Sequence, residues 1–303
     1  MINKTWLITG GTGSFGKEAV KTVLNEYQPK KVIVFSRDEL KQYEMANDLN
    51  DERDRMRYFI GDIRDLGRLR MALEDVNICI HAAALKQVPA AEYNPFECVK
   101  TNIMGSQNVI QACIDNGVEK VMALSTDKAV HPVNLYGKTK AVMENLFVAG
   151  NHYAKHTTFS VTRYGNVEGS RGSVIPLFRE QAKTGTLYIT HPDMTRFWIT
   201  LTEGVHFVLY ALSKMTGGEI FVPKLRSRRI EDIARDIAPE CNIEYIGIRP
   251  GEKIHETLIA KEEAYRTVEY DNNYVIHPSI SYFKYSAGRG KPIDIDFEYT
   301  SRI

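Results

Sequence analysis

The chain has 303 residues, of which 43% are hydrophobic and 25% charged, so it can bury a large core as one big domain or two small ones. Its 39 basic and 38 acidic side chains leave a net charge of +1, which gives no electrostatic reason to expect nucleic acid or a membrane surface as a partner. Apolar runs such as Val32–Phe35 have the length of a strand and are far too short to cross a membrane.

The distribution of special residues indicates a cytoplasmic protein. A strand pattern is established by Trp6, which leaves no room for a signal peptide. The 4 cysteines are scattered without the spacing of metal ligands, so we expect reduced and mostly structural thiols. The 8 histidines also lack ligand spacing, and we predict no catalytic metal.

The first half of the chain alternates short β-branched runs with longer helical patterns. Strands are predicted at Thr5–Thr9, Lys31–Phe35, Met56–Ile60, Ile78–Ala82, Lys120–Ser125 and Thr158–Tyr164. Helices are predicted between them at Phe15–Asn25, Glu39–Asn50, Leu66–Leu73, Pro95–Asn116 and Leu135–Asn151. The strands are apolar nearly throughout, which is typical of a parallel sheet with helices on both faces. The pattern predicts an α/β fold, a Rossmann-type doubly wound parallel sheet.

This rhythm breaks after about Asn166. Gly, Ser and Arg residues punctuate Glu168–Ser173, and short mixed elements follow. We expect residues 1–167 to form a dinucleotide-binding Rossmann domain to which 197–216 returns. Residues 168–303 are expected to form mainly a smaller α+β lobe that holds the substrate at the carboxyl edge of the sheet.

The turn after the first strand carries glycines at Gly10, Gly13 and Gly16. In a dinucleotide-binding turn the first glycine allows a tight bend, the second lets the backbone approach the pyrophosphate, and the third lets the helix pack closely. The amides at the start of the helix then bind the phosphates. Because this turn follows a strand and opens a helix, it predicts a dinucleotide site rather than an ordinary strand-to-helix turn.

The end of the second strand distinguishes NADP from NAD. A carboxylate there would bind the ribose 2′-hydroxyl of NAD, whereas a cation would accept the 2′-phosphate of NADP. Ser36 and Arg37 come first, Asp38 is better placed to start the next helix, and Lys41 follows one turn later. The order favours NADP, with a solvated loop arginine as the alternative.

Two stretches farther along the chain fit the rest of a dinucleotide. Asp62 and Ile63 follow the third strand and are well placed for the adenine. The run Ala82-Ala83-Ala84 comes after the fourth strand and leaves space beside the cofactor.

Tyr136 and Lys140 are four residues apart, so they share one face of the fifth predicted helix. A nearby ammonium lowers the pKa of a phenol, which would make Tyr136 a general base for a sugar hydroxyl. Lys140 could also hold the nicotinamide ribose. The Y-x-x-x-K spacing is common by chance on exposed helix faces, but its place after the fifth strand of a dinucleotide fold favours catalysis.

Together these features resemble the extended short-chain dehydrogenase/reductase family over essentially the whole chain. The resemblance implies oxidation of a nucleotide-sugar hydroxyl, with Tyr136 as base and the hydroxyl of Thr126 assisting it. Epimerases of this family usually carry small or hydroxyl residues in the loop before the tyrosine. The family's 4,6-dehydratases place an acid and a base there, as Asp127 and Lys128 stand here.

Elimination of water from a 4-keto sugar needs one group to take the proton at carbon 5 and another to protonate the hydroxyl leaving carbon 6. Lys128 suits the first role if a desolvated pocket lowers its pKa, and Asp127 suits the second if its own is raised. The alternative is a polar turn with a surface ion pair. With Tyr136 following in the same loop, we favour catalysis.

Several stretches are similar to the soluble UDP-N-acetylglucosamine 4,6-dehydratases, and most of all to the inverting enzymes of the pseudaminic acid pathway. They are Ala82–Lys86, Arg163–Val167, Gly169–Val174 and Arg249–Lys253. A sister group replaces the tyrosine of Y-x-x-x-K by methionine, whereas Tyr136 is kept here. Membrane-anchored retaining relatives carry a long N-terminal extension that is not seen here. Met194–Trp198 also matches but indicates no chemistry.

The resemblance implies UDP-N-acetylglucosamine as substrate and places Asn166, Arg249 and Glu252 on it. A guanidinium such as that of Arg249 matches a diphosphate, although Arg249–Glu252 also reads as a tight turn. The expected catalytic residues are Thr126, Asp127, Lys128, Tyr136 and Lys140. The expected substrate-binding residues are Lys86, Asn166, Val174, Arg249 and Glu252. The expected NADP-binding residues are Gly10, Thr12, Gly13, Ser14, Phe15, Gly16, Ser36, Arg37, Lys41, Asp62, Ile63, Ala82, Ala83, Lys86, Tyr136, Lys140 and Val167.

Three alternatives remain open at this point. A retaining dehydratase or a 4-epimerase could use the same scaffold, and a more distant possibility is a non-catalytic protein that senses NADP. The helices Pro95–Asn116 and Leu135–Asn151 resemble the family's dimer-forming pair, so we expect a homo-oligomer.

Overall fold

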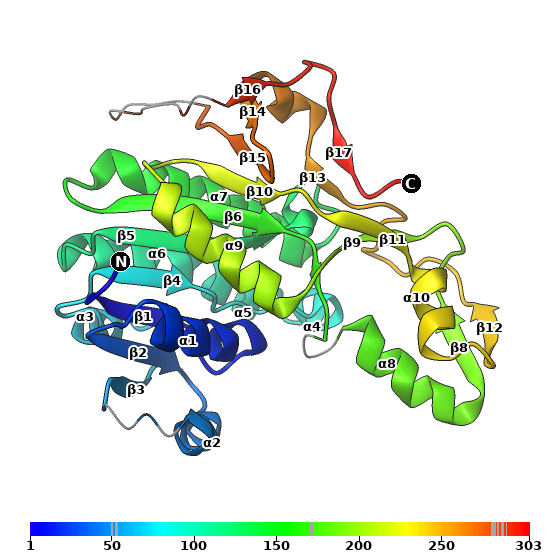
Figure 1. Ribbon diagram of the computed structural model, residues 1–303, viewed down its shortest axis with the longest axis horizontal. Coiled ribbons are helices and arrows are strands. Elements are labelled where there is room, and N and C mark those ends of the chain that lie inside the picture. The colour runs from blue at the N-terminus through cyan, green and yellow to red at the C-terminus, as the bar shows by residue number, and fades with distance from the viewer. Residues whose placement is uncertain are drawn as a thin grey trace.

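The computed structural model describes residues 1–49, 51, 54–169, 173–279, 283, 285, 288 and 290–303. Within these residues a ten-stranded sheet runs in the order β16-β14-β15-β10-β6-β5-β4-β1-β2-β3 (Figure 1). The strands from β3 to β10 are parallel, and β15, β14 and β16 extend the sheet in antiparallel fashion. The predicted Rossmann-type doubly wound fold is confirmed.

The parallel strands are β1 (Thr5–Thr9), β2 (Lys31–Ser36), β3 (Met56–Ile60), β4 (Ile78–His81), β5 (Lys120–Thr126), β6 (Thr158–Tyr164) and β10 (Ile220–Pro223). The antiparallel strands are β14 (Thr267–Glu269), β15 (Asn273–Ile276) and β16 (Lys291–Pro292). From β1 to β6, each strand begins at its predicted residue and ends within one residue of its predicted end.

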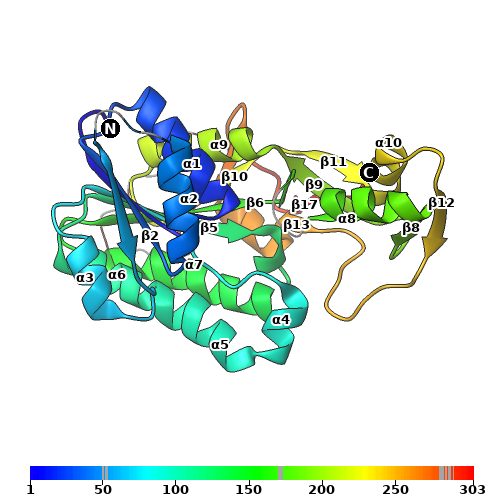
Figure 2. The same ribbon diagram turned by 90° about the horizontal axis from the view of Figure 1, so that it is seen from below.

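Helices cover both faces of this sheet, which explains why its strands are apolar throughout. On one face, α1 (Ser14–Glu26), α2 (Glu39–Leu49) and α9 (Leu201–Lys214) pack over Trp6 and Ile8 of β1. On the other face, α3 (Leu66–Ala72), α6 (Gly105–Asp115) and α7 (Leu135–Tyr153) pack over Leu7. Figure 2 shows the two helical layers on opposite sides of the strands. Because consecutive strand residues point to opposite faces, both sets must be hydrophobic.

Two local features depart from the predicted helices. The segment predicted as one helix over Pro95–Asn116 consists of α5 (Pro95–Val99), a π-helical turn at Lys100–Met104 and then α6. An additional helix, α4 (Val88–Tyr93), precedes it and was not predicted. Its proline in the first turn is a common helix-start signal that could have revealed it. The predicted end of the second helix, Asn50, lies outside the described residues.

Besides α9, the described part of the second half of the chain adds three small sheets and two further α-helices. The sheets pair β11 (Arg226–Arg229) and β7 (Asn166–Val167) with β9 (Thr195–Ile199), β12 (Asn242–Tyr245) with β8 (Thr186–Ile189), and β13 (Thr257–Ile259) with β17 (Tyr299–Thr300). The helices α8 (Val174–Gln181) and α10 (Ile230–Ile237) pack with β8 around a core of their own. The same half supplies β10 and β14–β16 to the large sheet, so the boundary at residue 167 stays a prediction.

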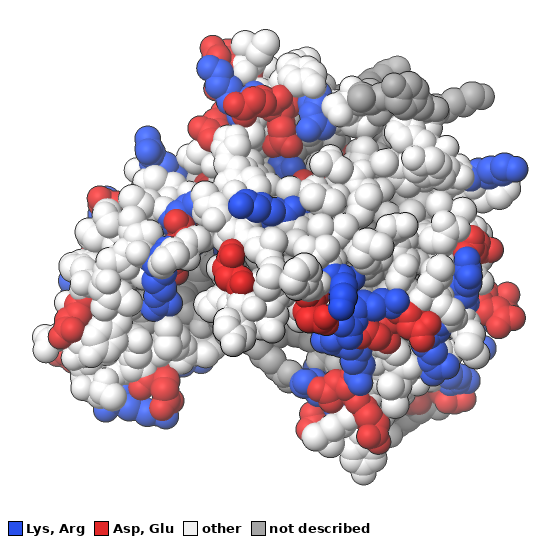
Figure 3. All heavy atoms as spheres, turned by 180° about the vertical axis from the view of Figure 1, so that it is seen from behind, with Lys and Arg blue, Asp and Glu red and all other residues white. Residues whose placement is uncertain are grey.

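The surface is mixed in charge. Figure 3 shows Lys and Arg interspersed with Asp and Glu over one face. Ion pairs between neighbouring elements, such as Arg70–Asp115 between α3 and α6, account for part of this mixture. In the described part of the chain, no helix combines the length and the hydrophobicity that a membrane crossing requires.

Candidate active site

A cavity of about 980 Å³ lies at the carboxyl ends of the parallel strands, where β1 and β4 run side by side. In doubly wound sheets this switch point is where nucleotides bind, because the connecting loops diverge there. The described lining includes every residue expected to bind the dinucleotide and every residue expected to be catalytic. It also includes residues that were not predicted, among them Phe35, Gly61, Gln87, Val88, Pro89, Thr101, Ser125, Tyr164, Ser173 and Leu201.

The glycine-rich turn is shaped to let the chain pass close to β4. Gly10 has φ +66°, and a Cβ there would lie 2.9 Å from the backbone N and Cα of Ala83. Gly13 caps the start of α1, so the first amides of that helix face the cavity. At Gly16 a Cβ would lie 2.4 Å from the Cα of Gly11. The third glycine therefore lets α1 pack closely against the turn itself. The cradle therefore fits a pyrophosphate.

Several buried polar atoms on the cavity wall have no hydrogen-bond partner within the described chain. They are the Thr101 Oγ1, Ser125 Oγ, Asp127 Oδ2, Asn166 Oδ1 and Ser173 Oγ atoms. A buried polar atom without a partner is costly and therefore rare, and a ligand is one group that can satisfy it. Their number on one wall indicates that this cavity is built to hold a polar molecule.

The end of β2 is arranged to leave a cation facing the cavity. Asp38 accepts a hydrogen bond from the backbone N of Lys41 at 3.0 Å and forms an ion pair with its ammonium, so it acts at the start of α2 as expected. The Ser36 hydroxyl is buried and accepts from Gln42 at 3.0 Å. Arg37 is 56% exposed and lies 3.7 Å from Asp62, which leaves most of its guanidinium accessible.

A buried histidine, which the sequence did not single out, ties β1 to β4 beneath the cradle. The Nδ1 of His81 lies 2.8 Å from the Thr9 hydroxyl, which also accepts from the backbone N of Ala83 at 3.3 Å. Its Nε2 lies 3.2 Å from the Ser106 hydroxyl. Burial lowers the pKa of His81 to about 3, and Lys140 adds to this effect. The ring is therefore neutral and fixes the separation of the two strands.

Tyr136 lies in the first turn of α7, close to the end of β5. Asn134 caps this helix by accepting from the backbone N of Gly137 at 2.8 Å. A Cβ at Gly137 would lie 2.1 Å from the carbonyl oxygen of Lys128, so a glycine after the tyrosine lets the helix approach the catalytic loop. This approach brings Tyr136 and Lys128 to the same cavity wall.

The prediction that Lys140 lowers the pKa of Tyr136 is wrong. Lys140 is buried and donates to the Leu124 carbonyl oxygen at 2.6 Å, and burial lowers its own pKa to about 8. Burial raises the pKa of Tyr136 to about 12, while Lys128 and the Thr126 hydroxyl act to lower it. The cation that favours the phenolate is therefore Lys128.

The acid and base of the loop form a tight pair. Asp127 is fully buried, and its Oδ1 accepts from the Lys128 ammonium at 3.0 Å and from the Thr126 hydroxyl at 2.9 Å. The condition set for Lys128 as a base, a pKa lowered by desolvation, is not met. Burial does lower it, but Asp127 and Glu256 outweigh burial and raise the pKa above its ordinary value. Glu256 lies 3.5 Å from Lys128 and was not predicted.

The expected substrate-binding residues fall into two groups. Asn166 and Lys86 line the cavity, and burial followed by the charge of Lys128 lowers the pKa of Lys86. Arg249, Glu252 and Val174 lie outside the described cavity wall. Arg249 and Glu252 end a turn closed by a 3.1 Å hydrogen bond from the Glu252 N to the Arg249 O.

That turn abuts the rim of the cavity. The carbonyl oxygen of Gly251 accepts from the Asn134 side chain at 2.8 Å, and a Cβ on Gly251 would lie 3.5 Å from Val88, which lines the cavity. The turn and a ligand contact are thus compatible. Of the stretch Gly169–Val174, residues 170–172 lie outside the described residues.

Comparison with known proteins agrees with this geometry. Residues 6–278 match the family model described as polysaccharide biosynthesis protein. The UDP-N-acetylglucosamine 4,6-dehydratase (inverting) of Campylobacter jejuni is 54% identical, over 98% of this chain and 92% of that protein. A UDP-glucose 4-epimerase of Rickettsia bellii is 43% identical, over 99% and 91%. The structure of Pen from Bacillus thuringiensis is 37% identical and superimposes with a TM-score of 0.91, over 99% and 92%.

The span of the family match, residues 6–278, covers both the glycine-rich turn and the loop from Thr126 to Tyr136. The chain belongs to the polysaccharide biosynthesis protein family, within the extended short-chain dehydrogenases/reductases that its motifs predicted.

Proposed function

We propose that this protein is an inverting UDP-N-acetylglucosamine 4,6-dehydratase, which forms UDP-2-acetamido-2,6-dideoxy-β-L-arabino-hex-4-ulose for pseudaminic acid-type nucleotide-sugar synthesis. The observation that carries the proposal is the pair that the buried Asp127 makes with Lys128 at 3.0 Å, in a cavity that both residues line together with Tyr136. Elimination of water needs a proton acceptor and a proton donor close together, and an epimerase has no use for the pair. The 54% identity to the Campylobacter jejuni enzyme supports the same assignment.

NADP is the proposed cofactor. The turn from Gly10 to Gly16 and the start of α1 would hold the pyrophosphate, Asp62 and Ile63 the adenine, and Arg37 the 2′-phosphate. Asp38 supports this choice because its carboxylate is engaged with Lys41. When bound there, the dinucleotide supplies the hydride acceptor and donor for a reaction without net redox change.

Tyr136 is assigned to the proton of the sugar 4-hydroxyl. Its raised pKa means that the phenol is protonated at neutral pH, so it needs a neighbouring cation to act as a base. Lys128 and the Thr126 hydroxyl both favour the phenolate. We assign Lys140 to the nicotinamide ribose, because its buried ammonium shares the same cavity wall.

Asp127 and Lys128 are assigned to the elimination, with Lys128 taking the proton at carbon 5 and Asp127 protonating the hydroxyl that leaves carbon 6 as water. The raised pKa of Lys128 requires it to lose its own proton first. Asp127 Oδ1 lies 3.0 Å from the ammonium and can accept that proton. This one transfer leaves a neutral amine and a carboxylic acid, the two forms that the roles need. Inversion follows when a proton returns to carbon 5 on the opposite face.

Incubation with UDP-N-acetylglucosamine and NADP in deuterated water, followed by NMR, tests the proposal. A 4-keto-6-deoxy product with deuterium at carbon 5 and the L-arabino configuration is expected. Retention at carbon 5 would identify a retaining dehydratase. Conversion to a 4-epimer that keeps the 6-hydroxyl would support the epimerase activity for which the Rickettsia relative is named. If the protein bound NADP tightly but converted no substrate, the result would favour the non-catalytic protein that senses NADP.

The setting of the enzyme is also proposed. All four cysteines are free thiols, which suits the reducing cytoplasm where nucleotide sugars are made.

Phe96 on α5, Met104 in the π-helical turn and Val142 on α7 are exposed large hydrophobic side chains on the helices expected to form a homo-oligomer. Light scattering that gave a monomer mass at micromolar concentration would contradict the oligomer.

A further inference from the structure

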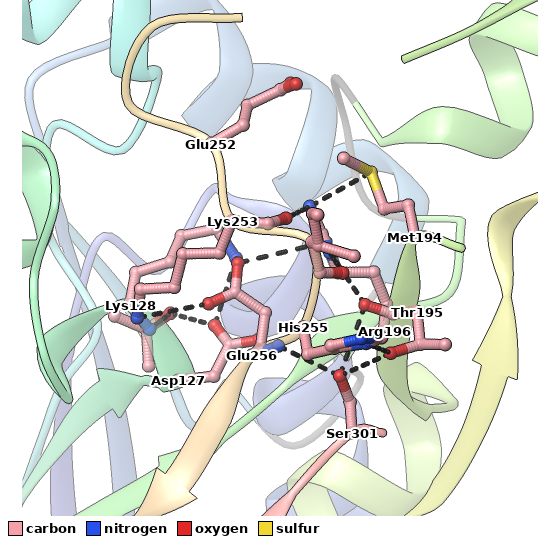
Figure 4. Close-up of polar contacts among 12 residues, drawn as sticks. Asp127, Lys128, Met194, Thr195, Arg196, Glu252, Lys253, His255, Glu256 and Ser301 are labelled. Atoms are coloured by element: carbon pink, nitrogen blue, oxygen red, sulfur yellow. Dashed lines mark hydrogen bonds and ion pairs between the residues drawn. The ribbon is translucent and has the colours of Figure 1, made fainter. Parts of the chain in front are cut away.

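Three charged side chains near Lys128, those of Glu256, Arg196 and Lys253, have no role in the proposed chemistry. Figure 4 shows Glu256 between Lys128 and the side chains of Arg196 and Lys253. Glu256 is 2% exposed, and its Oε1 lies 3.5 Å from the Lys128 ammonium and 3.8 Å from Arg196 Nε. Its Oε2 lies 3.5 Å from the Lys253 ammonium. A carboxylate from a segment distant in sequence therefore lies beside the ammonium of the catalytic lysine.

Glu256 is fixed by its backbone, and its side chain is held by ion pairs, since its buried Oε2 makes no hydrogen bond within the described residues. Its backbone N donates to the Ser301 hydroxyl at 2.9 Å, and its carbonyl oxygen accepts from the Ser301 N at 2.8 Å. Arg196 is 7% exposed and donates to the carbonyl oxygens of Thr195, Ile254 and Lys253, so its guanidinium cannot swing away from Glu256. The Met194–Trp198 stretch, which indicated no chemistry in the sequence, supplies this arginine.

We propose that Glu256, held by Arg196 and Lys253, is a positioning residue that orients the Lys128 amine toward Asp127 and controls which of the two residues carries the shared proton. This inference rests on the proposed function. Lys128 lines the cavity, whereas Glu256 does not and acts only through Lys128.

The charges around Lys128 decide the direction of this effect. Asp127 and Glu256 stabilise its ammonium, whereas Arg196, Lys86 and the bulk of the protein around it oppose the charge. Tyr136 faces Lys128 from α7, and the positive charge of Lys128 lowers the pKa of the phenol. Without Glu256 the ammonium loses one of its two carboxylates, so the proton moves to Asp127 more readily.

The same segment carries the turn proposed to contact the substrate. Gly251 bonds to Asn134, Lys253 donates to the Val130 carbonyl oxygen at 2.6 Å, and Glu256 pairs with Lys128. Residues 251–256 thus lie along the loop from Asp127 to Asn134. This one short segment therefore positions both the turn proposed to contact the substrate and the Lys128 side chain.

The pH profile of kcat in Glu256→Gln tests the inference. The amide keeps the shape and removes the charge, so the pKa of Lys128 falls and the limb that it controls shifts to lower pH by about one unit or more. The KM for UDP-N-acetylglucosamine should change less than about twofold, because Glu256 does not touch the substrate. Glu256→Asp should restore part of the wild-type profile. Glu269→Gln, which removes a carboxylate paired with Lys224 on the far edge of the sheet, should leave the profile unchanged.

A second readout does not depend on catalysis. Protein labelled with ¹³C at the lysine Cε is titrated by NMR, and the Lys128 signal is the one missing from Lys128→Met. Its titration should move to lower pH in Glu256→Gln. An unmoved Lys128 titration in a folded Glu256→Gln protein would overturn the inference. If wild-type protein gives no dehydratase product but the Lys128 titration still shifts, the proposed function fails while the control of the lysine stands.

Discussion

Replacing Arg163 by leucine should destabilise the protein far more than removing any surface ion pair. Arg163 on β6 is 3% exposed and pairs with two carboxylates, the buried Glu144 of α7 at 2.6 Å and the partly buried Glu263 at 2.8 Å. It also donates to the Leu258 carbonyl oxygen at 2.9 Å. Breaking a buried ion pair by removing one partner costs about 3–5 kcal/mol, because the remaining charge stays buried. In Arg163→Leu the buried Glu144 would lose the cation that it pairs with, whereas Glu263 would keep its ion pair with Arg266 at 3.4 Å, so the expected loss falls within that range.

The loss should depend on pH in a defined direction. Burial raises the pKa of Glu263, but Arg163 outweighs burial and lowers it below the ordinary value. A depressed pKa stabilises the folded state above the unfolded pKa of about 4.3, and this stabilisation is lost as the pH falls through the folded pKa. In Arg163→Leu the Glu263 carboxylate loses this opposite charge while it stays largely buried, so its pKa rises and it is protonated more readily on acidification. The difference between wild type and variant therefore narrows from pH 7 towards pH 5.

Urea unfolding at pH 7 and pH 5, followed by circular dichroism, measures both quantities. Arg235→Leu is the control, since Arg235 is 57% exposed and pairs with Glu231 at 2.8 Å on the surface. Its loss should be at most about 1 kcal/mol at either pH. A loss in Arg163→Leu no larger than in this control, or one that does not change with pH, would refute the reasoning.

Three further predictions concern the cavity. Gly10→Ala should weaken dinucleotide binding by about tenfold or more by calorimetry, because its Cβ would meet Ala83, whereas Gly117→Ala, with a similar φ and open space, should leave binding unchanged. Arg37→Ala should raise the Kd for NADPH about tenfold or more and leave that for NADH nearly constant; equal losses would contradict the 2′-phosphate role. Tyr136→Phe should lower kcat by about 10²–10⁴ in the product assay with little change in KM, and an active variant would remove the phenol from the mechanism.

The sheet could be predicted from the sequence because its signals are local. Each strand from β1 to β6 is a largely apolar run of strand length followed by a helical pattern, and all but the edge strand β3 are buried on both faces. The dinucleotide turn and the Asp127–Lys128–Tyr136 loop could be located for the same reason, since each is a short motif at the end of a strand. The π-helical turn at Lys100–Met104 could not, because the residues that it buries, Thr101 and Asn102, are polar and add nothing to the apolar pattern.

The surroundings of the catalytic lysine could not be predicted. Glu256 and Arg196 meet Lys128 through contacts between distant segments, and neither stands in a periodic pattern. From the sequence only the effect of burial on the pKa of Lys128 could be considered, and Asp127 and Glu256 together reverse that effect. Short strands such as β8 and β12 pair only across long separations, so the second half of the fold lacks local signals as well.

The placement of β10 beside β6 has a consequence for biosynthesis on the ribosome. β10 pairs with β6 at Ile220 and Val161, so the growing chain carries an unpaired edge on β6 until β10 emerges. At 5–20 residues per second, the roughly 60 residues that separate the two strands take about 3–12 s to translate. During that interval the nascent sheet can pair with another nascent chain. Incomplete chains that end between these strands should aggregate, and chaperone binding should concentrate in that window of synthesis.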